Sequence, residues 1–255
     1  MPNGSMAVIT GGTAGIGRAC AEALLAAGAR GVLINGRDAG RAERARVDIQ
    51  AQFPRARVAV ALGDVSKAEV AEAVMAQAIQ QLGRIDVLVN STGGNDLPRL
   101  LFRTPPAQIP GIFERCLFAQ ILSCAAALPY MREAGGGAVI NIASDAGKIP
   151  TPGESVIGAS MAGIIMFTRA LAVEGKRDGI RANVLTPSLT SGTEHYDKVM
   201  ADPFAGRLFA KAEKMAALGV VSKEELAGLA VFLASSAAAK ITGQAISMTG
   251  GISAL

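Results

Sequence analysis

The sequence predicts an α/β protein built on a doubly wound parallel sheet of about seven strands, with helices on both faces. Short, nearly continuous apolar runs alternate with helical patterns along all 255 residues, and parallel strands that are buried on both faces have this character. A glycine-rich turn directly follows the first apolar run and leads into a helical pattern. No long linker or composition break interrupts the alternation, so we expect a single domain over residues 1–255.

Each predicted strand is a short apolar run bounded by glycine or polar residues. The seven runs occupy residues 6–10, 31–35, 57–63, 85–90, 137–144, 180–187 and 244–250. The segments between them have helical periodicity, at residues 18–29, 38–53, 67–83, 108–135, 154–175 and 223–237. Parallel strands need crossover connections of this length, and helices usually supply them.

One segment, residues 188–219, departs from the alternation. It lies between the sixth predicted strand and the last predicted helix, so it leaves the carboxyl end of a strand. Ligands of open α/β sheets bind beyond the carboxyl ends of the strands. We therefore predict that residues 188–219 form a lid over a substrate.

The composition argues against several classes of partner. The formal charge is +4, but the basic residues are spread along the chain, and there are only two tyrosines, eight phenylalanines and no tryptophan. We therefore expect a small molecule as the partner, and not a nucleic acid. The three cysteines form no CxxC pair, which argues against a bound metal and a disulfide framework and favours a reducing compartment.

The sequence also predicts where in the cell the protein is located. The first residues contain no basic segment followed by an apolar run, and the uncharged stretch at 155–168 is too short to cross a bilayer. We therefore expect a cytoplasmic protein without a membrane partner.

The glycine-rich turn carries the first functional signal. Gly11 permits a tight turn, while Gly15 and Gly17 let the backbone approach a pyrophosphate at the start of a helix. Unpaired N–H groups and the helix dipole favour an anion there. A turn in this place predicts a dinucleotide-binding domain of the Rossmann type.

The spacing Thr-Gly-x-x-x-Gly-x-Gly resembles that of the short-chain dehydrogenase/reductase family. The resemblance covers essentially the whole chain, and its further segments are GDVS at 63–66, LVNSTGG at 88–94, GGAVINIAS at 136–144, GIRANVLTP at 179–187 and ITGQAISMTGG at 241–251. Ser91 and Thr92 depart from the Asn-Asn-Ala-Gly of that family. The resemblance implies an NAD(P)-dependent oxidoreductase. It assigns coenzyme contacts to Gly11, Thr13, Gly15, Ile16, Gly17, Arg37, Asp64, Val65, Asn90, Pro187 and Thr190.

The residues after the second predicted strand bear on the type of coenzyme. Family members that use NAD carry an acidic residue at the position of Gly36, where it binds the ribose hydroxyls. Here Gly36 is followed by Arg37, which suits a 2′-phosphate. Ala14 stands where many NADP enzymes have a basic residue. We therefore expect NADP(H) rather than NAD(H).

The catalytic signature of the family is changed in this sequence. Ser144 occupies the position of the catalytic serine, but the positions of the Tyr-x-x-x-Lys pair hold Ile157 and Met161, and that of the supporting asparagine holds Cys116. In the family, the tyrosine gives a proton to the substrate oxygen, and neither isoleucine nor methionine can do so. Ile157 and Met161 share one helix face and predict an apolar pocket floor.

Several other residues are candidates for the missing acid. His195, the only histidine, and its neighbour Tyr196 lie in the predicted lid. Asp145, Lys148 and Glu154 lie between the serine and the altered helix. Each of these residues could instead be an ordinary solvated loop residue. Ser144 could likewise serve only the geometry of its turn.

Three classes of function therefore remain open. The first is an NADP(H)-dependent oxidoreductase with a degenerate catalytic tetrad, acting on a small apolar carbonyl, enone or hydroxy compound. The second is a non-redox isomerase or lyase on the same scaffold, and the third is a catalytically inactive nucleotide-binding or partner protein. The resemblance also implies a homodimer or homotetramer joined through the two long central helices.

Overall fold

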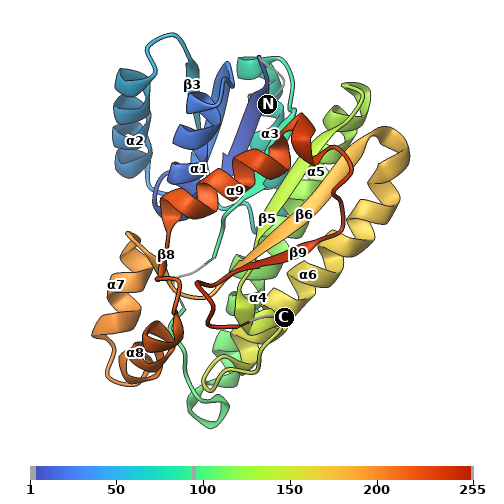
Figure 1. Ribbon diagram of the computed structural model, residues 1–255. Coiled ribbons are helices and arrows are strands. Elements are labelled where there is room, and N and C mark those ends of the chain that lie inside the picture. The colour runs from blue at the N-terminus through green and yellow to red at the C-terminus, as the bar shows by residue number, and fades with distance from the viewer. Residues whose placement is uncertain (1–3, 94–95, 254–255) are drawn as a thin grey trace.

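A seven-stranded parallel sheet forms the centre of the computed structural model, which describes residues 4–93 and 96–253 (Figure 1). The strands are β1 (Met6–Thr10), β2 (Gly31–Gly36), β3 (Arg57–Leu62), β4 (Val87–Asn90), β5 (Gly137–Ile142), β6 (Ile180–Pro187) and β9 (Ala245–Met248). Their order is β3-β2-β1-β4-β5-β6-β9, and every neighbouring pair is parallel. The predicted doubly wound sheet is confirmed.

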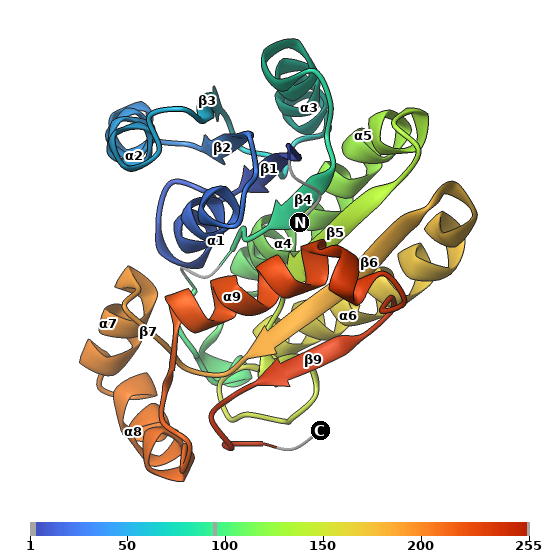
Figure 2. The same cartoon turned by 45° about the horizontal axis from the view of Figure 1, so that its top comes forward.

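The helices cover both faces of the sheet, as Figures 1 and 2 show. They are α1 (Gly15–Ala26), α2 (Ala39–Gln52), α3 (Ala68–Leu82), α4 (Ile109–Phe113), α5 (Ala119–Glu133), α6 (Ser155–Gly175), α7 (Glu194–Ala201), α8 (Ala205–Met215) and α9 (Lys223–Ala234). Side chains cap the first turn of several helices: Asp38 accepts the N–H of Arg41 before α2, and Ser222 and Glu225 form a capping box at α9.

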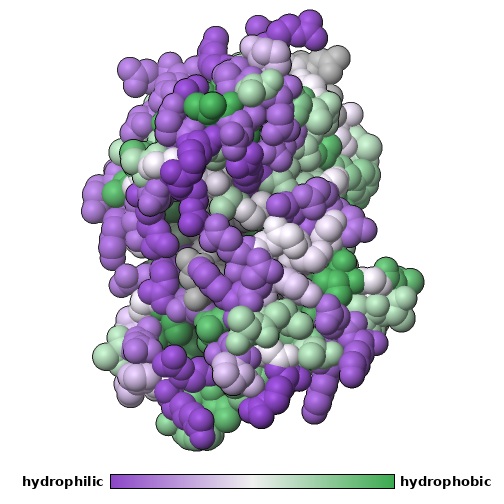
Figure 3. Space-filling model, turned by 90° about the vertical axis from the view of Figure 1, so that its left-hand side faces the viewer, coloured by the Kyte–Doolittle hydropathy of each residue, from purple (hydrophilic) through white to green (hydrophobic). Residues whose placement is uncertain are grey.

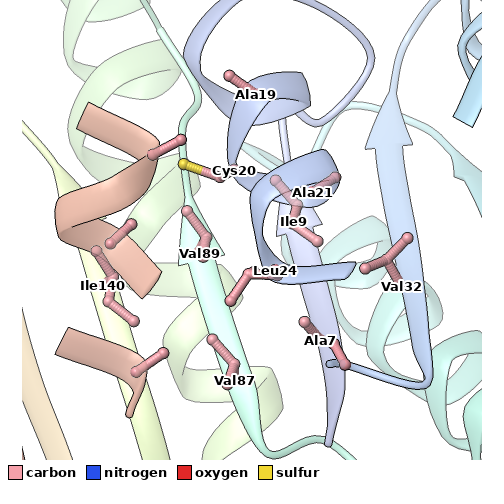
Figure 4. Close-up of a cluster of buried hydrophobic side chains, with 14 of the residues drawn as sticks. Ala7, Ile9, Ala19, Cys20, Ala21, Leu24, Val32, Val87, Val89 and Ile140 are labelled. Carbon is pink, nitrogen blue, oxygen red and sulfur yellow. The ribbon is translucent and has the colours of Figure 1, made fainter. Parts of the chain in front are cut away.

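Two hydrophobic layers enclose the sheet, because successive side chains of a strand point to opposite faces. Ala7 and Ile9 of β1 face the layer of α1, α2 and α9, whereas Val8 faces that of α3, α5 and α6. Figure 4 shows the first layer, in which Leu24 of α1 packs beside β1 and β4. The near-continuous apolar strands of the sequence are explained by this burial on both sides.

Two helical segments are apolar and long enough to cross a membrane by length and composition alone, Pro106–Glu133 and Ser155–Asp178. The second of them, Ser155–Asp178, extends beyond the uncharged stretch at 155–168 that is too short to cross a bilayer. In the structure α5 and α6 pack against the sheet through buried residues such as Ala127 and Leu171. Their apolar character therefore has a structural cause within the fold.

The predicted long helix at 108–135 is not α-helical throughout. A π-helical turn, Glu114–Phe118, separates α4 from α5. Such turns are inserted into α-helices frequently at functional sites, and this one carries Cys116. The sequence contains no glycine or proline within the turn that would have predicted it.

The segment 188–219 is more regular than expected. It contains the short strand β7 (Thr190–Ser191), which pairs with β8 (Val221–Ser222), and then the helices α7 and α8. Thr193 caps α7 by accepting the N–H of Tyr196, and Asp202 accepts two N–H groups before α8. In Figures 1 and 2 this helix pair lies at the end of the molecule to which the strand arrows point.

Candidate functional site

The glycine turn after β1 is closely packed against the end of β4. Gly11 has φ +67° and Gly15 has φ +52°, which other residues rarely adopt. A side chain at Gly11 would collide with the carbonyl oxygen of Ser91, and one at Gly17 would collide with that of Gly11. The three predicted glycines are therefore required by conformation or close approach.

The start of α1 is open to an anion. Ala14 stands at its N-cap position and offers no side-chain hydrogen bond, so no side chain satisfies the first N–H groups. The hydroxyl Oγ1 of Thr92, beside the same turn, is buried without a partner among the described residues. An orphaned buried hydroxyl next to an uncapped helix start fits a nucleotide coenzyme, whose hydroxyls and phosphates would satisfy both.

The end of β2 has no room for an acidic side chain at position 36. A Cβ at Gly36 would stand 2.6 Å from Cγ2 and 2.7 Å from Oγ1 of Thr13. Arg37 is exposed and lies 3.9 Å from a carboxylate oxygen of Asp64. Burial acts to raise the pKa of Asp64, but hydrogen bonds from Ser66 and the charge of Arg37 outweigh it, so the pKa lies below its usual value.

The other residues assigned to the coenzyme differ in what they can offer. Val65 is 3% exposed with its side chain in the core, so only its backbone is left for a ligand. Ile16 packs against the core layer of α1. Pro187 ends β6, and Thr190 is buried in β7. Their contacts with a coenzyme remain predictions.

The side chain of Asn90 is committed to a buried polar network inside the fold. Thr10 Oγ1 donates to Asn90 Oδ1 at 2.9 Å, and Asn90 Nδ2 donates to Asn141 Oδ1 at 2.9 Å. Asn141 Nδ2 in turn donates to Thr168 Oγ1 at 2.8 Å. The chain of bonds ties β1, β4, β5 and α6 together. A coenzyme contact of Asn90 would therefore come from its backbone, and the sequence analysis missed Asn141 and Thr168.

Ser144 lies two residues beyond the end of β5, in a turn that packs against α6. Its Oγ accepts the N–H of Ala146 at 3.2 Å. A Cβ at Gly158 of α6 would stand 2.7 Å from the carbonyl oxygen of Ala146, and one at Gly147 would stand 2.8 Å from the backbone of Met161. The structure thus brings the turn of Ser144 against the helix that carries Ile157 and Met161.

Cys116, Ile157 and Met161 meet in one small apolar cluster. Cys116 is 1% exposed and Met161 7% exposed, and both belong to a cluster with Ile112, Ile164 and Val184, against which Ile157 packs. A Cβ at Gly93 would stand 3.1 Å from the sulfur of Cys116, so the cluster reaches the loop after β4. The apolar character expected of this helix face agrees with the packing, and its role as a pocket floor stays a prediction.

His195 and Tyr196 lie in α7, and both are poorly suited to donate a proton. Burial and the charge of Lys198 lower the pKa of His195 despite the opposing charge of Asp96, and its Nδ1 is buried without a partner in the described chain. Tyr196 donates its hydroxyl proton to Glu213 at 2.7 Å, and this hydrogen bond raises its pKa. The structure uses Tyr196 to join α7 to α8.

Lys148 does not replace the missing cation at position 161. Its Nζ donates to the carbonyl oxygen of Ala245 and to Oγ of Ser247, both at 2.8 Å. Burial lowers its pKa, although the charge of Asp145 opposes this effect. Lys148 therefore fastens the loop after Ser144 to β9.

A cavity of about 590 Å³ adjoins the glycine turn on its outer side, between α1, α2 and the start of α7. Its walls mix bases with acids: Arg18, Arg41, Arg44, Lys223, Glu22, Asp48, Glu194 and Glu224. Figure 3 views the molecule from this side and shows a mainly hydrophilic surface, hollowed between an upper and a lower part. Within residues 4–93 and 96–253, no group of three or more His, Cys, Asp or Glu could hold a metal ion.

The fold and the glycine turn define a dinucleotide-binding α/β protein, and comparison with known proteins identifies its family. The family model of the short chain dehydrogenases matches residues 5–203. D-beta-hydroxybutyrate dehydrogenase of Cupriavidus necator is 33% identical over 258 residues, covering 98% of each chain. The chain therefore belongs to the short chain dehydrogenase family, whose named relatives are oxidoreductases.

Solved structures agree with this assignment and differ in their coenzymes. L-sorbose reductase of Gluconobacter frateurii, complexed with NADPH and L-sorbose, is 30% identical with a TM-score of 0.89, covering 98% of this chain and 97% of its own. A 7α-hydroxysteroid dehydrogenase complexed with NADH is 27% identical with a TM-score of 0.89, covering 98% of this chain and 94% of its own. Proteins of this family bind NAD(P), and the fold is compatible with either form.

Proposed function

We propose that this protein is an NADP(H)-dependent oxidoreductase with a degenerate catalytic tetrad, acting on a small apolar carbonyl, enone or hydroxy compound. The observation that carries the proposal is the pairing of two features at one edge of the sheet. The open glycine turn with the orphaned hydroxyl of Thr92 suits a nucleotide coenzyme. Beside Ser144, the cluster of Cys116, Ile157 and Met161 suits an apolar substrate.

The residues of the chain would divide the work as follows. The turn at Gly11–Gly17 would hold the pyrophosphate, Arg37 the 2′-phosphate, and Thr92 a hydroxyl or amide of the coenzyme. A bound nicotinamide coenzyme supplies or accepts a hydride. Ser144 Oγ–H would donate a hydrogen bond to the substrate oxygen, because its Oγ only accepts from Ala146 in the described chain. The helix pair α7–α8 would cover the substrate, as a lid over a single domain.

The test begins with calorimetric titration of the protein with NADPH, NADP⁺, NADH and NAD⁺. Micromolar binding that favours the 2′-phosphorylated forms would support the proposal. Oxidation of NADPH is then followed with benzaldehyde and with 9,10-phenanthrenequinone. Coenzyme binding without turnover would favour the third class, a catalytically inactive nucleotide-binding or partner protein. No binding of any coenzyme would contradict the proposal.

Arg37 provides a direct test of the preference for NADP(H). Arg37→Ser is expected to weaken NADPH binding by about 10- to 100-fold, because a charge-assisted contact with the 2′-phosphate contributes about 1.5–3 kcal/mol. NADH binding should change by less than about twofold. Arg46→Ser is the matched control, since Arg46 pairs with Glu43 on the same helix. Equal loss of both coenzymes in Arg37→Ser would contradict the assignment.

We further propose a cytoplasmic homodimer or homotetramer. Large apolar side chains remain exposed on the two central helices: Met166 and Val173 on α6 are both 62% exposed, and Phe118 before α5 is 46% exposed. Placing a charge in such a face is costly when a partner covers it. Met166→Glu is therefore expected to shift the protein toward the monomer in light scattering, while Gln80→Glu on α3 should not. An unchanged mass would contradict this interface.

A further inference from the structure

One buried and one half-buried carboxyl group, those of Asp145 and Glu154, lie near the start of α6, in the part of the site that the family signature does not use. Asp145 directly follows Ser144, is 5% exposed, and its Oδ1 has no hydrogen-bond partner among the described residues. Glu154 is the residue before α6. Within the described chain, neither carboxyl forms an ion pair.

The geometry of α6 places Glu154 on the same side as the turn of Ser144. Glu154, Gly158 and Met161 are four and three residues apart, so they share one helix face. That face meets the turn, because Gly158 approaches the carbonyl oxygen of Ala146 and the backbone of Met161 approaches Gly147. Glu154 therefore lies about one helical turn before Ile157, at the N-terminal end of the same face of α6.

The charges around Glu154 favour its protonated form. Burial raises the pKa of Glu154 to about 7, the Thr151 side chain opposes this effect, and the negative charge of Asp145 reinforces it. The nearby cations are used elsewhere. The Nζ of Lys148 donates to β9, and the guanidinium of Arg99 donates to Gln108. The backbone N–H of Arg99 donates to the carbonyl oxygen of Gly153 at 2.7 Å.

We propose that Glu154 is the proton donor of this altered site and that Asp145 is the neighbouring charged group that supports it in this role. The proposal rests on the proposed oxidoreductase function. In the reduction of an apolar carbonyl compound, a bound nicotinamide coenzyme would supply a hydride to the carbonyl carbon. The Oε–H bond of Glu154 breaks as its proton bonds to the carbonyl oxygen, giving an alcohol and a Glu154 carboxylate. Solvent then returns a proton to that carboxylate.

The first part of the experiment measures the carboxyl group without any substrate. The protein is labelled with ¹³C at the glutamate carboxyl carbons, and the Glu154 signal is assigned by its loss in Glu154→Gln. Its titration midpoint in the wild type is expected near pH 7. In Asp145→Asn the midpoint should fall, because the neighbouring negative charge is removed. A wild-type midpoint below about 5.5 would overturn the proposal.

The second part compares two substrates that differ in their need for an acid. Hydride addition to benzaldehyde develops a strongly basic alkoxide oxygen, whereas hydride addition to 9,10-phenanthrenequinone gives an alkoxide beside a second carbonyl group, whose electron withdrawal makes the oxygen less basic. Glu154→Gln should lower kcat/KM for benzaldehyde by about 10²–10⁴ and should change that for the quinone by less than about threefold. In the wild type, kcat/KM for benzaldehyde should fall as the pH rises through about 7, and this fall should be absent in the variant.

Glu72→Gln is the matched control, because Glu72 is an exposed glutamate on α3. It should leave both substrates and the titration of Glu154 unchanged. Equal rates of benzaldehyde reduction by the wild type and by Glu154→Gln would overturn the role of Glu154 but not the proposed oxidoreductase function. So would reduction of the quinone but not of benzaldehyde by the wild type. NADPH binding without reduction of either compound would instead refute the proposed function, and the role of Glu154 with it.

Discussion

Introducing the family tetrad, by Cys116→Asn, Ile157→Tyr and Met161→Lys together, is expected to raise kcat/KM for benzaldehyde by about 10²–10⁴ in a protein whose own donor has been removed by Glu154→Gln. The tyrosine would supply a proton at the face of α6 that meets the turn of Ser144. The lysine would lower the pKa of that tyrosine. Residues that act as a unit are strongly non-additive, so each single change should gain little. Met161→Lys alone would place a cation in a cluster that is otherwise apolar.

The control for these substitutions is the same variant with Ile157→Phe in place of Ile157→Tyr. Phenylalanine has nearly the size of tyrosine but no hydroxyl, so it separates the effect of a proton donor from that of filling the pocket. Both forms carry Glu154→Gln, because any proton from Glu154 is then removed. Equal rates for the tyrosine and phenylalanine forms, with NADPH binding retained, would show that position 157 does not face the reacting oxygen.

Removing Asn141 is expected to lower the free energy of unfolding by about 2–4 kcal/mol. Asn141→Ala leaves the amide of Asn90 without its oxygen acceptor and the hydroxyl of Thr168 without its donor. It also opens a cavity in the core of the sheet. An unsatisfied buried polar group costs about 1–3 kcal/mol, and a cavity adds to this cost. The midpoint of thermal unfolding should fall by about 5–15 °C.

Two controls make this stability result specific. Asn141→Leu keeps the volume and removes the hydrogen bonds, so its difference from Asn141→Ala reports the contribution of the cavity. Gln80→Ala on the exposed side of α3 should change stability by less than about 0.5 kcal/mol. A loss below about 1 kcal/mol in Asn141→Ala would mean that the network contributes little to stability.

The sequence by itself determined the sheet and the coenzyme turn, because both depend on local patterns. Apolar runs such as 6–10 can be buried on both faces only in a covered parallel sheet, and the structure contains that strand with the same bounds. Gly11 and Gly17 stand where backbone segments nearly touch. The assignment of Ile157 and Met161 to the positions of the usual catalytic pair rests on their spacing from Ser144 and stays a prediction.

Only the tertiary structure decided which polar groups are available for chemistry. Tyr196 of α7 donates its hydroxyl proton to Glu213, and Lys148 donates to β9, and neither contact follows from a local pattern. Asn90 is likewise taken up by Asn141, which lies 51 residues away. Glu154 looked like any other loop glutamate in the sequence. Its pKa depends on burial and on the charge of Asp145, and both arise only when the turn after β5 folds against the start of α6.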